Sequence, residues 1–145
     1  MSALHDFKKL VETEKKAFTD DKVLELSREL GKHLASGGKA NKENSRTQVR
    51  KFFNLVKVAK TSANSEASKP EQVKVKLRLL QAQVTYATAR EIISPDFKEL
   101  FDTSINKIIM AGDKQKDSMN DFATFFEALY AYFYFHTTKK ESDRS

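Results

Sequence analysis

Hydrophobic residues recur at intervals of three and four along most of the chain, which is the spacing that gathers them on one face of an α-helix. Two polar stretches, at 35–45 and 61–69, interrupt this pattern. Ser45, followed three residues later by a glutamine, matches a capping box, and Pro70 and Pro95 suit the first turns of helices. These features predict about six helices, at residues 4–18, 21–34, 46–60, 70–93, 95–109 and 119–136.

Two segments need a separate interpretation. The segment 70–93 is apolar over a wide arc, because Val75, Leu79 and Tyr86 flank its main stripe, and we expect it to be a central helix with neighbours on several sides. The run Tyr130–Phe135 is rich in aromatic residues, which favour strands. The helical spacing nevertheless continues through this run, and no partner strand is apparent, so we predict that it is helical.

The sequence therefore predicts an all-α protein, a compact bundle of about five to six helices in a single domain spanning residues 1–145. Four glycines and two prolines are too few for the many turns of an all-β fold. Residues 35–45 are expected to form a mobile connection and residues 137–145 a polar tail. The predicted core contains Phe53, Leu80, Val84, Phe101, Ile105, Phe126, Leu129 and Phe133.

Composition excludes several classes of function. The chain has no cysteine, which excludes disulfides, thiolate metal sites and cysteine nucleophiles. It has no apolar signal core near its start and no run of roughly 18 apolar residues, so we expect a cytoplasmic protein without a membrane partner. His5, His33 and His136 lie far apart, without the spacing of metal ligands, and we predict no metal or other cofactor.

The net charge of +6 is distributed unevenly along the chain. Residues 1–34 are neutral, residues 35–90 carry +9 and residues 91–145 carry −3. Between Arg46 and Lys60 there are five cations and no acidic residue, although helices usually mix the two signs because unlike charges three or four residues apart stabilise them. This segment predicts a surface that binds a polyanion; a basic but merely solvated helix face is the alternative.

Within this segment, Arg46, Arg50 and Lys57 lie within about 40° of one another on a helix of 100° per residue. They form a ridge along one edge of the apolar face, which we call the basic ridge. Arg50 is the first candidate for contact with an anion. Lys51 and Lys60 are secondary candidates in the same acid-free segment.

No catalytic constellation is found. The glycine pair at 37–38 and the lysine after it resemble the end of a phosphate-binding loop, but Ala40 replaces the required serine or threonine and the preceding segment is helical. Asp20 and Asp21 are explained as a helix cap. Aromatic residues of the last helix could stack on nucleic-acid bases, although eleven phenylalanines in a chain without tryptophan are more typical of a core. We therefore predict no catalytic residues.

Three segments, taken in order, carry a family resemblance. They are TQVRKFF at Thr47–Phe53, a pattern that runs from Leu77 through Tyr86 to Ala89-Arg90-Glu91, and FATFFEALYAYF at Phe122–Phe133. Between about Ser45 and His136 the chain resembles the small α-helical subunit of type III-A CRISPR effector complexes, the Csm complex. Ala89 stands where related sequences often have glycine. Residues 1–44 add little to the resemblance.

The resemblance implies a non-catalytic, RNA-binding protein of antiviral defence. In such complexes several copies of the small subunit line up beside a filament of backbone subunits and contact the guide RNA–target RNA duplex, mainly its target strand. Target cleavage belongs to the backbone subunit, and nucleotide cyclisation and DNA cutting belong to the large subunit. The expected partners are therefore guide RNA, target RNA, backbone and large subunits, and further copies of the chain. A subunit repeated along a guide of any sequence must bind phosphates and duplex shape, not base identity.

Cations of the segment 70–93 extend the candidate RNA-binding set. Lys76 and Arg90 lie on one line of this helix, inside its wide apolar arc, where an unpaired charge is costly. Arg90 therefore either contacts RNA or forms a structural pair with an acid such as Glu127 or Asp121. Arg78 faces the opposite side, as a phosphate contact or a solvated residue. The complete predicted set is Arg46, Arg50, Lys51, Lys57, Lys60, Lys76, Arg78 and Arg90.

Two other functions are weighed against RNA binding. One is a helical protein–protein adaptor whose aromatic face docks on a partner and whose charge is incidental. The other is a small nucleic-acid enzyme, for which the sequence offers no positive feature. Phosphate binding weakens steeply as salt rises, whereas docking through aromatic residues is nearly indifferent to salt, so the salt response separates RNA binding from the adaptor.

Overall fold

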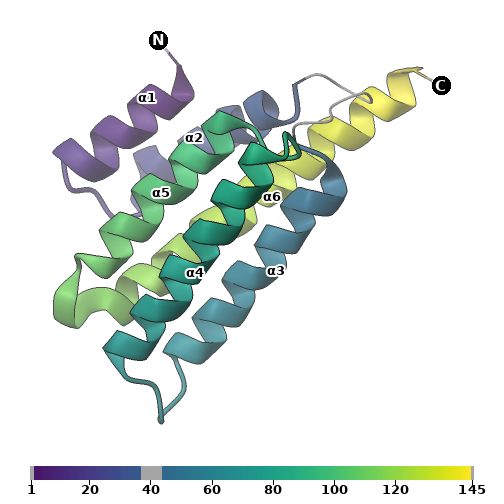
Figure 1. Ribbon diagram of the computed structural model, residues 1–145. Coiled ribbons are helices and arrows are strands. Elements are labelled where there is room, and N and C mark those ends of the chain that lie inside the picture. Colours follow the sequence, from purple (N-terminus) through teal and green to yellow (C-terminus); the bar gives the residue numbers. More distant parts are fainter. Residues whose placement is uncertain (1, 37–43, 145) are drawn as a thin grey trace.

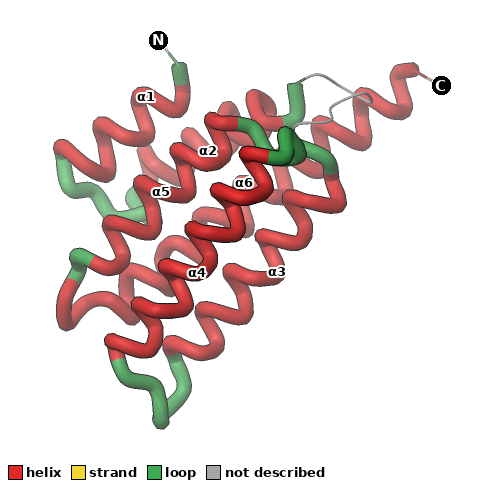
Figure 2. Tube along the Cα trace, in the orientation of Figure 1, coloured by secondary structure: helices red, strands yellow, loops and turns green. Residues whose placement is uncertain are grey.

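The computed structural model describes residues 2–36 and 44–144, with side chains up to residue 138 (Figures 1 and 2). This part of the chain contains helices and no strand, which confirms the predicted all-α class. Residues 37–43, with the glycine pair and most of the predicted mobile connection, lie outside the described residues. In chain order the elements are α1 (Ala3–Lys8), the π-helical turn η1 (Lys9–Thr13), α2 (Asp21–Leu34), α3 (Arg46–Ala63), α4 (Pro70–Ala89), α5 (Pro95–Ile109), the 3₁₀ turn η3 (Gly112–Lys114) and α6 (Gln115–Arg144).

The last helix, α6, is the central element of the bundle. It contacts α2, α3 and α5, and in Figure 1 it passes behind α5, α4 and α3. Helix α6 can contact neighbours in different directions because it is apolar on two sides. On one side Phe122 and Phe126 pack against Phe101 of α5, with ring centroids 5.9 and 5.2 Å away, and on another Phe125 lies 5.1 Å from Phe7 of α1. All five rings are buried, so α6 organises the core.

Helix α4 lies at the surface between α3 and α5, and the prediction that it is central is wrong. Its apolar residues form two stripes on opposite faces, because Val75, Leu79 and Tyr86 lie about half a turn from the buried residues. The exposed stripe is 60, 58 and 64% accessible at these three positions. The buried stripe consists of Val73, Leu77, Leu80, Val84 and Ala87.

Helix α4 also ends four residues earlier than predicted, at Ala89. A Schellman motif closes it: the amide of Ile92 donates to the carbonyl of Ala87 at 3.1 Å, and the amide of Glu91 donates to the carbonyl of Thr88 at 3.0 Å. Glu91 has a φ of 61°, the left-handed conformation that glycine usually supplies at this position. The hydrophobic spacing continues to Ile93, and no glycine marks the turn at Glu91, so the end of the helix at Ala89 was not predicted.

The predicted caps are present. The side chain of Asp20 accepts a hydrogen bond from the amide of Lys22, and that of Ser45 accepts one from the amide of Gln48. Ser94, which was not predicted as a cap, caps α5 in the same way. The aromatic run Tyr130–Phe135 is helical, as its spacing predicted.

The first and last elements differ from their predicted bounds. The helical start of the chain ends at Thr13, before Phe18, which is still buried although it lies in a turn. At the other end, α6 continues through the predicted polar tail to Arg144. Polar composition alone therefore did not show that the helix extends past Thr137.

Seven of the eight predicted core residues are buried. The exception is Phe53, which is only partly buried, because it lies at the edge of the contact between α3 and α6. There its ring stacks on Tyr130, with centroids 4.5 Å apart and an angle of 13° between the planes. The edge occupied by these two rings is where the candidate site begins.

Helix α2 approaches α6 very closely at Gly31. A Cβ atom at this position would lie 2.7 Å from the Cβ of Tyr132 and 2.8 Å from the backbone nitrogen of Phe133. Both distances are shorter than carbon and nitrogen atoms tolerate, so this contact requires glycine.

Candidate nucleic-acid interface

Helix α3 presents the basic ridge beside its buried face. The helix buries Val49, Phe52, Val56, Ala59 and Ala63. Next to this face, Arg50 and Lys57 are exposed and Arg46 is partly buried. The guanidinium carbon of Arg46 lies 5.7 Å from the ring centroid of Tyr134, and Nζ of Lys57 lies 5.3 Å from that of Phe53. The ridge predicted from helical periodicity therefore lies beside Phe53 of α3 and Tyr134 of α6.

The ridge and α6 enclose a shallow depression, which we call the α3–α6 groove. The two helices run antiparallel: Asn64 pairs with Asn120 at one end of α3, and Arg46 donates to Thr138 at the other. The cations of the ridge are therefore spread along the groove. Its lining consists of Arg50, Phe53, Asn54, Lys57, Tyr130 and Tyr134.

No carboxylate among the described residues neutralises Arg50 or Lys57. The ion pairs formed within this part of the chain lie elsewhere, in α1, α2 and α5. They join Lys8 to Glu99, His33 to Asp96 and Lys98 to Asp102, each at 2.6 Å. Exposed cations that form no ion pair with a described carboxylate contribute a positive potential at the groove, which favours an anionic ligand.

The other predicted cations of α3 and α4 do not line this groove. Lys51 and Lys60 are exposed on α3, and Nζ of Lys51 lies 5.5 Å from the ring centroid of Phe52. On α4, Lys76 donates to Ser62 Oγ at 2.7 Å, and Arg78 donates to Gln81 and Asn106. The eight predicted residues therefore divide into a groove set and a set spread over other parts of α3 and over α4.

Arg90 is exposed, and its guanidinium lies 5.7 Å from the ring centroid of Tyr86. Neither Glu127 nor Asp121 pairs with it in the described structure, so the structural-pair interpretation is wrong. The physical reason is the division of α4 into two apolar stripes. The line through Lys76 and Arg90 runs beside the exposed stripe, where a charge remains hydrated.

The tyrosines of the groove were not among the site residues predicted from the sequence. Tyr130 and Tyr134 lie beside the phenylalanine stripe of α6, on the side that meets α3. Their positions carry a usable signal, because a tyrosine at the border of an apolar stripe can bury its ring and keep its hydroxyl in water. Asn54 was also missed, and nothing in its local sequence distinguishes it.

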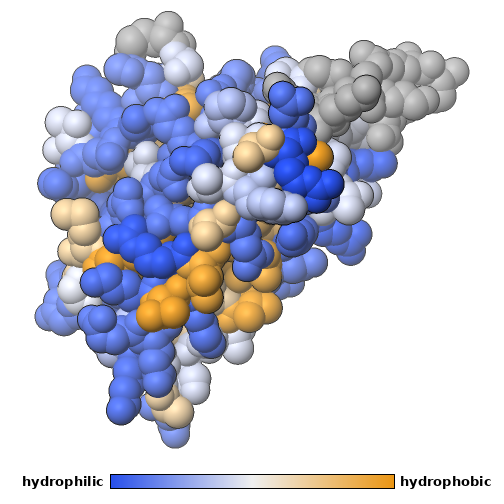
Figure 3. All heavy atoms as spheres, viewed as in Figure 1, coloured by the Kyte–Doolittle hydropathy of each residue, from blue (hydrophilic) through white to orange (hydrophobic). Residues whose placement is uncertain are grey.

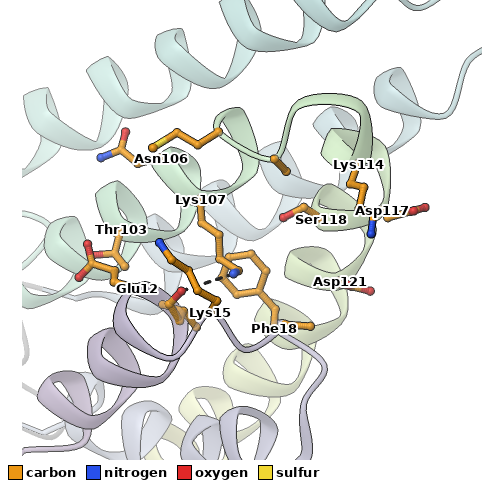
Figure 4. A pocket seen from close by; sticks show the side chains of 14 residues that line it. Glu12, Lys15, Phe18, Thr103, Asn106, Lys107, Lys114, Asp117, Ser118 and Asp121 are labelled. Carbon is orange, nitrogen blue, oxygen red and sulfur yellow. Dashed lines mark hydrogen bonds between the residues drawn. The ribbon is translucent and has the colours of Figure 1, made fainter.

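A second cavity lies between η1, α5 and the start of α6 (Figure 4). Lys107 reaches into it, 3.4 Å from the carbonyl of Val11 and 5.8 Å from the ring centroid of Phe18. Burial, with a smaller effect of the charge on Lys15, lowers the pKa of Lys107, and Asp121 opposes this change. Further charges of both signs surround the cavity, so it has no strong preference for an anion; they are Glu12, Lys114 and Asp117.

In the described part of the chain, no three His, Asp or Glu side chains are placed to hold one metal ion. None of the helices formed by these residues has both the length and the hydrophobicity that a bilayer-spanning helix needs.

A family model described as Csm2 Type III-A matches residues 19–139. No curated protein and no solved structure matches the chain. The matched range begins before Ser45 and includes α2, so the match extends to residues 19–44, beyond the segment that carried the sequence resemblance. It also includes all of the α3–α6 groove. The chain therefore belongs to the Csm2 Type III-A family, the small helical subunit of the type III-A CRISPR effector complex.

Proposed function

We propose that this protein is the non-catalytic, RNA-binding small subunit of its effector complex and that the α3–α6 groove is its phosphate-binding surface. Several copies would lie along the guide RNA–target RNA duplex, next to backbone and large subunits, in the cytoplasm. The observation that carries the proposal is the pair of exposed cations, Arg50 and Lys57, which no described carboxylate neutralises.

The spacing of these cations suits a linear polyanion. Arg46 and Lys57 are eleven residues apart on α3, which corresponds to about 16 Å along the helix axis, with Arg50 between them. A row of cations of this length can follow several phosphates of one strand, whereas a single anion needs donors that converge on one point. Phosphate contacts position an RNA without reading its bases, as a subunit that serves every guide must do.

One copy provides few phosphate contacts, so the isolated subunit is expected to bind RNA weakly. Aligned copies and neighbouring subunits would raise the overall affinity, because each further contact becomes intramolecular. We propose no cleavage step for this chain. The family resemblance implies that target cleavage belongs to the backbone subunit, and the residues that line the groove offer no nucleophile paired with a base.

The test is a double variant, Arg50→Ala with Lys57→Ala. It should weaken binding to every RNA sequence alike and flatten the slope of log affinity against log salt by roughly 1.4 to 1.8. A matched control is Lys9→Ala with Lys22→Ala, which removes the same charge from exposed positions that lie among acids. The control should leave the slope unchanged, and the helical circular dichroism of both variants should match that of the parent.

An unchanged salt slope in the Arg50/Lys57 variant would contradict the proposal. So would an equal loss of binding in the control variant, since that would show a dependence on net charge alone. In assembled complexes the Arg50/Lys57 change should reduce target binding but leave the cleavage positions the same, because the cutting groups belong to another subunit.

The adaptor function has one observation in its favour and is the second candidate. The exposed stripe of α4, with Val58 of the adjacent α3 at 62% exposure, forms an apolar surface that is visible over these two helices in Figure 3. In a member of a multi-subunit complex, such a surface suits contact with another protein subunit. Arg90 and Lys76 border it, so a partner with carboxylates around an apolar centre would fit. Leu79→Ser should then reduce co-purification with the complex without changing the salt slope of RNA binding.

A further inference from the structure

We infer that the α3–α6 groove holds one unpaired RNA nucleotide, with its base against the ring of Tyr134 and adjacent phosphates on Arg50 and Lys57. This inference rests on the proposed function and makes its ligand more specific. The groove would favour RNA that has an unstacked base, as in a single strand, over a continuous duplex.

The arrangement of rings in the groove supports this inference. Phe53 and Tyr130 stack on one another and so cover one face of each ring. Tyr134 follows one turn later on α6, 6.3 Å from Tyr130, and its side chain is 47% exposed. Burial in the core does not account for the exposed part of this ring. Tyr134 therefore presents aromatic surface in the same groove as the two cations.

The chemistry around Tyr134 selects for a nucleotide. The guanidinium of Arg46 lies 5.7 Å from its ring centroid, a cation–π contact that restricts the orientation of the ring. Arg50 and Lys57 line the same groove and supply positive charge for a phosphate. A ring next to phosphate-binding cations is the combination by which proteins hold single-stranded nucleic acid, with bases stacked on rings and the backbone on basic residues.

The geometry of RNA explains why an unpaired base is required. In an A-form duplex each base face is covered by its neighbours in the stack, and only the phosphates, the 2′-hydroxyls and the base edges remain accessible. The ridge can therefore bind either form of RNA through phosphates. Tyr134 can add to binding only when a base leaves its stack, so the two kinds of residue respond differently to the same pair of RNAs.

Two other aromatic residues are exposed in the described part of the chain, and neither lines the groove with its two cations. Phe135 is 55% exposed and lies next to His136, outside the groove lining. Tyr86 is 64% exposed but belongs to the apolar stripe of α4, with Arg90 over its ring. Phe135 is therefore a suitable control, since it is an exposed ring on the same helix that does not line the groove.

The experiment uses the full chain and a short RNA that contains 2-aminopurine, whose fluorescence falls when the base stacks on a ring. The RNA is supplied either as a single strand or as a perfect duplex. Tyr134→Leu should weaken single-strand binding roughly tenfold, abolish the fluorescence change and alter duplex binding less than twofold. Tyr134→Phe should restore both signals, and Phe135→Leu should change neither.

The possible outcomes separate the two proposals. If Arg50→Ala with Lys57→Ala loses binding while Tyr134→Leu binds both RNAs as the parent does, the stacking inference is overturned and the phosphate-binding function stands. An equal loss for single strand and duplex in Tyr134→Leu also overturns the inference, because it would mean that the ring supports only the protein fold. If the Arg50/Lys57 variant binds like the parent, the proposed function itself fails.

Discussion

Two surface depressions of this protein contain lysines but differ in what surrounds them. The depression between α1 and α2 includes Lys9 and Lys22, and four carboxylates share its lining: Asp6, Glu14, Glu25 and Glu29. The α3–α6 groove includes Arg50 and Lys57 and no carboxylate, and aromatic rings occupy the positions between its cations. In the first, carboxylates outnumber the cations of the lining; in the second, no carboxylate belongs to the lining.

The difference shows that cations alone do not define an anion-binding surface. Residues 1–34 contain as many basic as acidic side chains, and their helices mix the two signs as solvated helices usually do. All charged residues of helix α3 are cations, and the periodicity of the helix places three of them on the edge that faces α6. We therefore attribute the proposed anion preference to the absence of acids from α3 and to the rings that α6 places beside it.

The largest expected effect comes from loosening the side of the bundle that carries α2. Gly31→Ala introduces a Cβ 2.8 Å from the backbone of α6, which cannot move aside, and should lower the free energy of unfolding by about 1–3 kcal/mol. Denaturant unfolding and faster amide exchange in α2 would show the loss. Lys32→Ala, at the exposed neighbouring position, should be nearly neutral. RNA affinity per folded molecule should not change, and a loss of affinity would show that the groove depends on the position of α2.

A smaller effect is expected when the α1–α2 depression is made basic. Glu25→Lys with Glu29→Lys replaces two negative charges by two positive ones and so raises the net charge by four, which should raise RNA affinity at low salt by less than about tenfold and steepen the salt slope. No 2-aminopurine fluorescence change should accompany this gain, because no aromatic residue lines that depression. A fluorescence change equal to that of the parent groove would remove the distinction between the two surfaces.

The end of α4 provides a still smaller effect, on stability alone. Glu91→Gly removes the energetic cost of holding a residue with a side chain in the left-handed conformation. The greater conformational freedom of glycine in the unfolded chain offsets part of this gain. The net effect should be a rise in the free energy of unfolding of about 0.5–1 kcal/mol. Glu91→Ala is the control, because it removes the same carboxylate but keeps the Cβ and the strain. Equal stability of the two variants, measured by urea denaturation, would show that the φ of 61° costs little.

The smallest effect concerns Lys107, in the cavity that is lined by charges of both signs. Burial lowers the pKa of Lys107 in the folded protein. At a pH below this lowered pKa the amine is protonated in both the folded and the unfolded protein, and burial of its charge then reduces the free energy of unfolding. This cost disappears as the pH rises toward the ordinary pKa of 10.5. Lys107→Met should therefore raise the thermal midpoint at pH 7 by roughly 1 °C, and the gain should shrink in alkaline solution. The matched control is Lys114→Met, which removes the same charge from an exposed position on the same cavity. A gain that persists at alkaline pH would mean that packing, not charge, causes it.

The sequence by itself determined the features that arise within single helices. The caps at Asp20 and Ser45, the helical state of Tyr130–Phe135 and the alignment of Arg50 with Lys57 all depend on residues a few positions apart. Interactions at that range repeat with the pitch of the helix, so spacing alone reveals them. The all-α class and most of the core followed from the same periodicity.

Only the tertiary structure decided which apolar surfaces are covered and which side chains meet. Two opposite stripes on α4 contain the same kinds of residue, and the positions of α3 and α5 determine that Leu80 is buried and Leu79 exposed. Likewise, Tyr134 is far from Arg50 in the sequence, yet the antiparallel contact of α3 with α6 places both in one groove. The physical reason is that hydrophobic burial is not directional: helical spacing shows which residues share a face, but the neighbours packed against that face determine what it contacts.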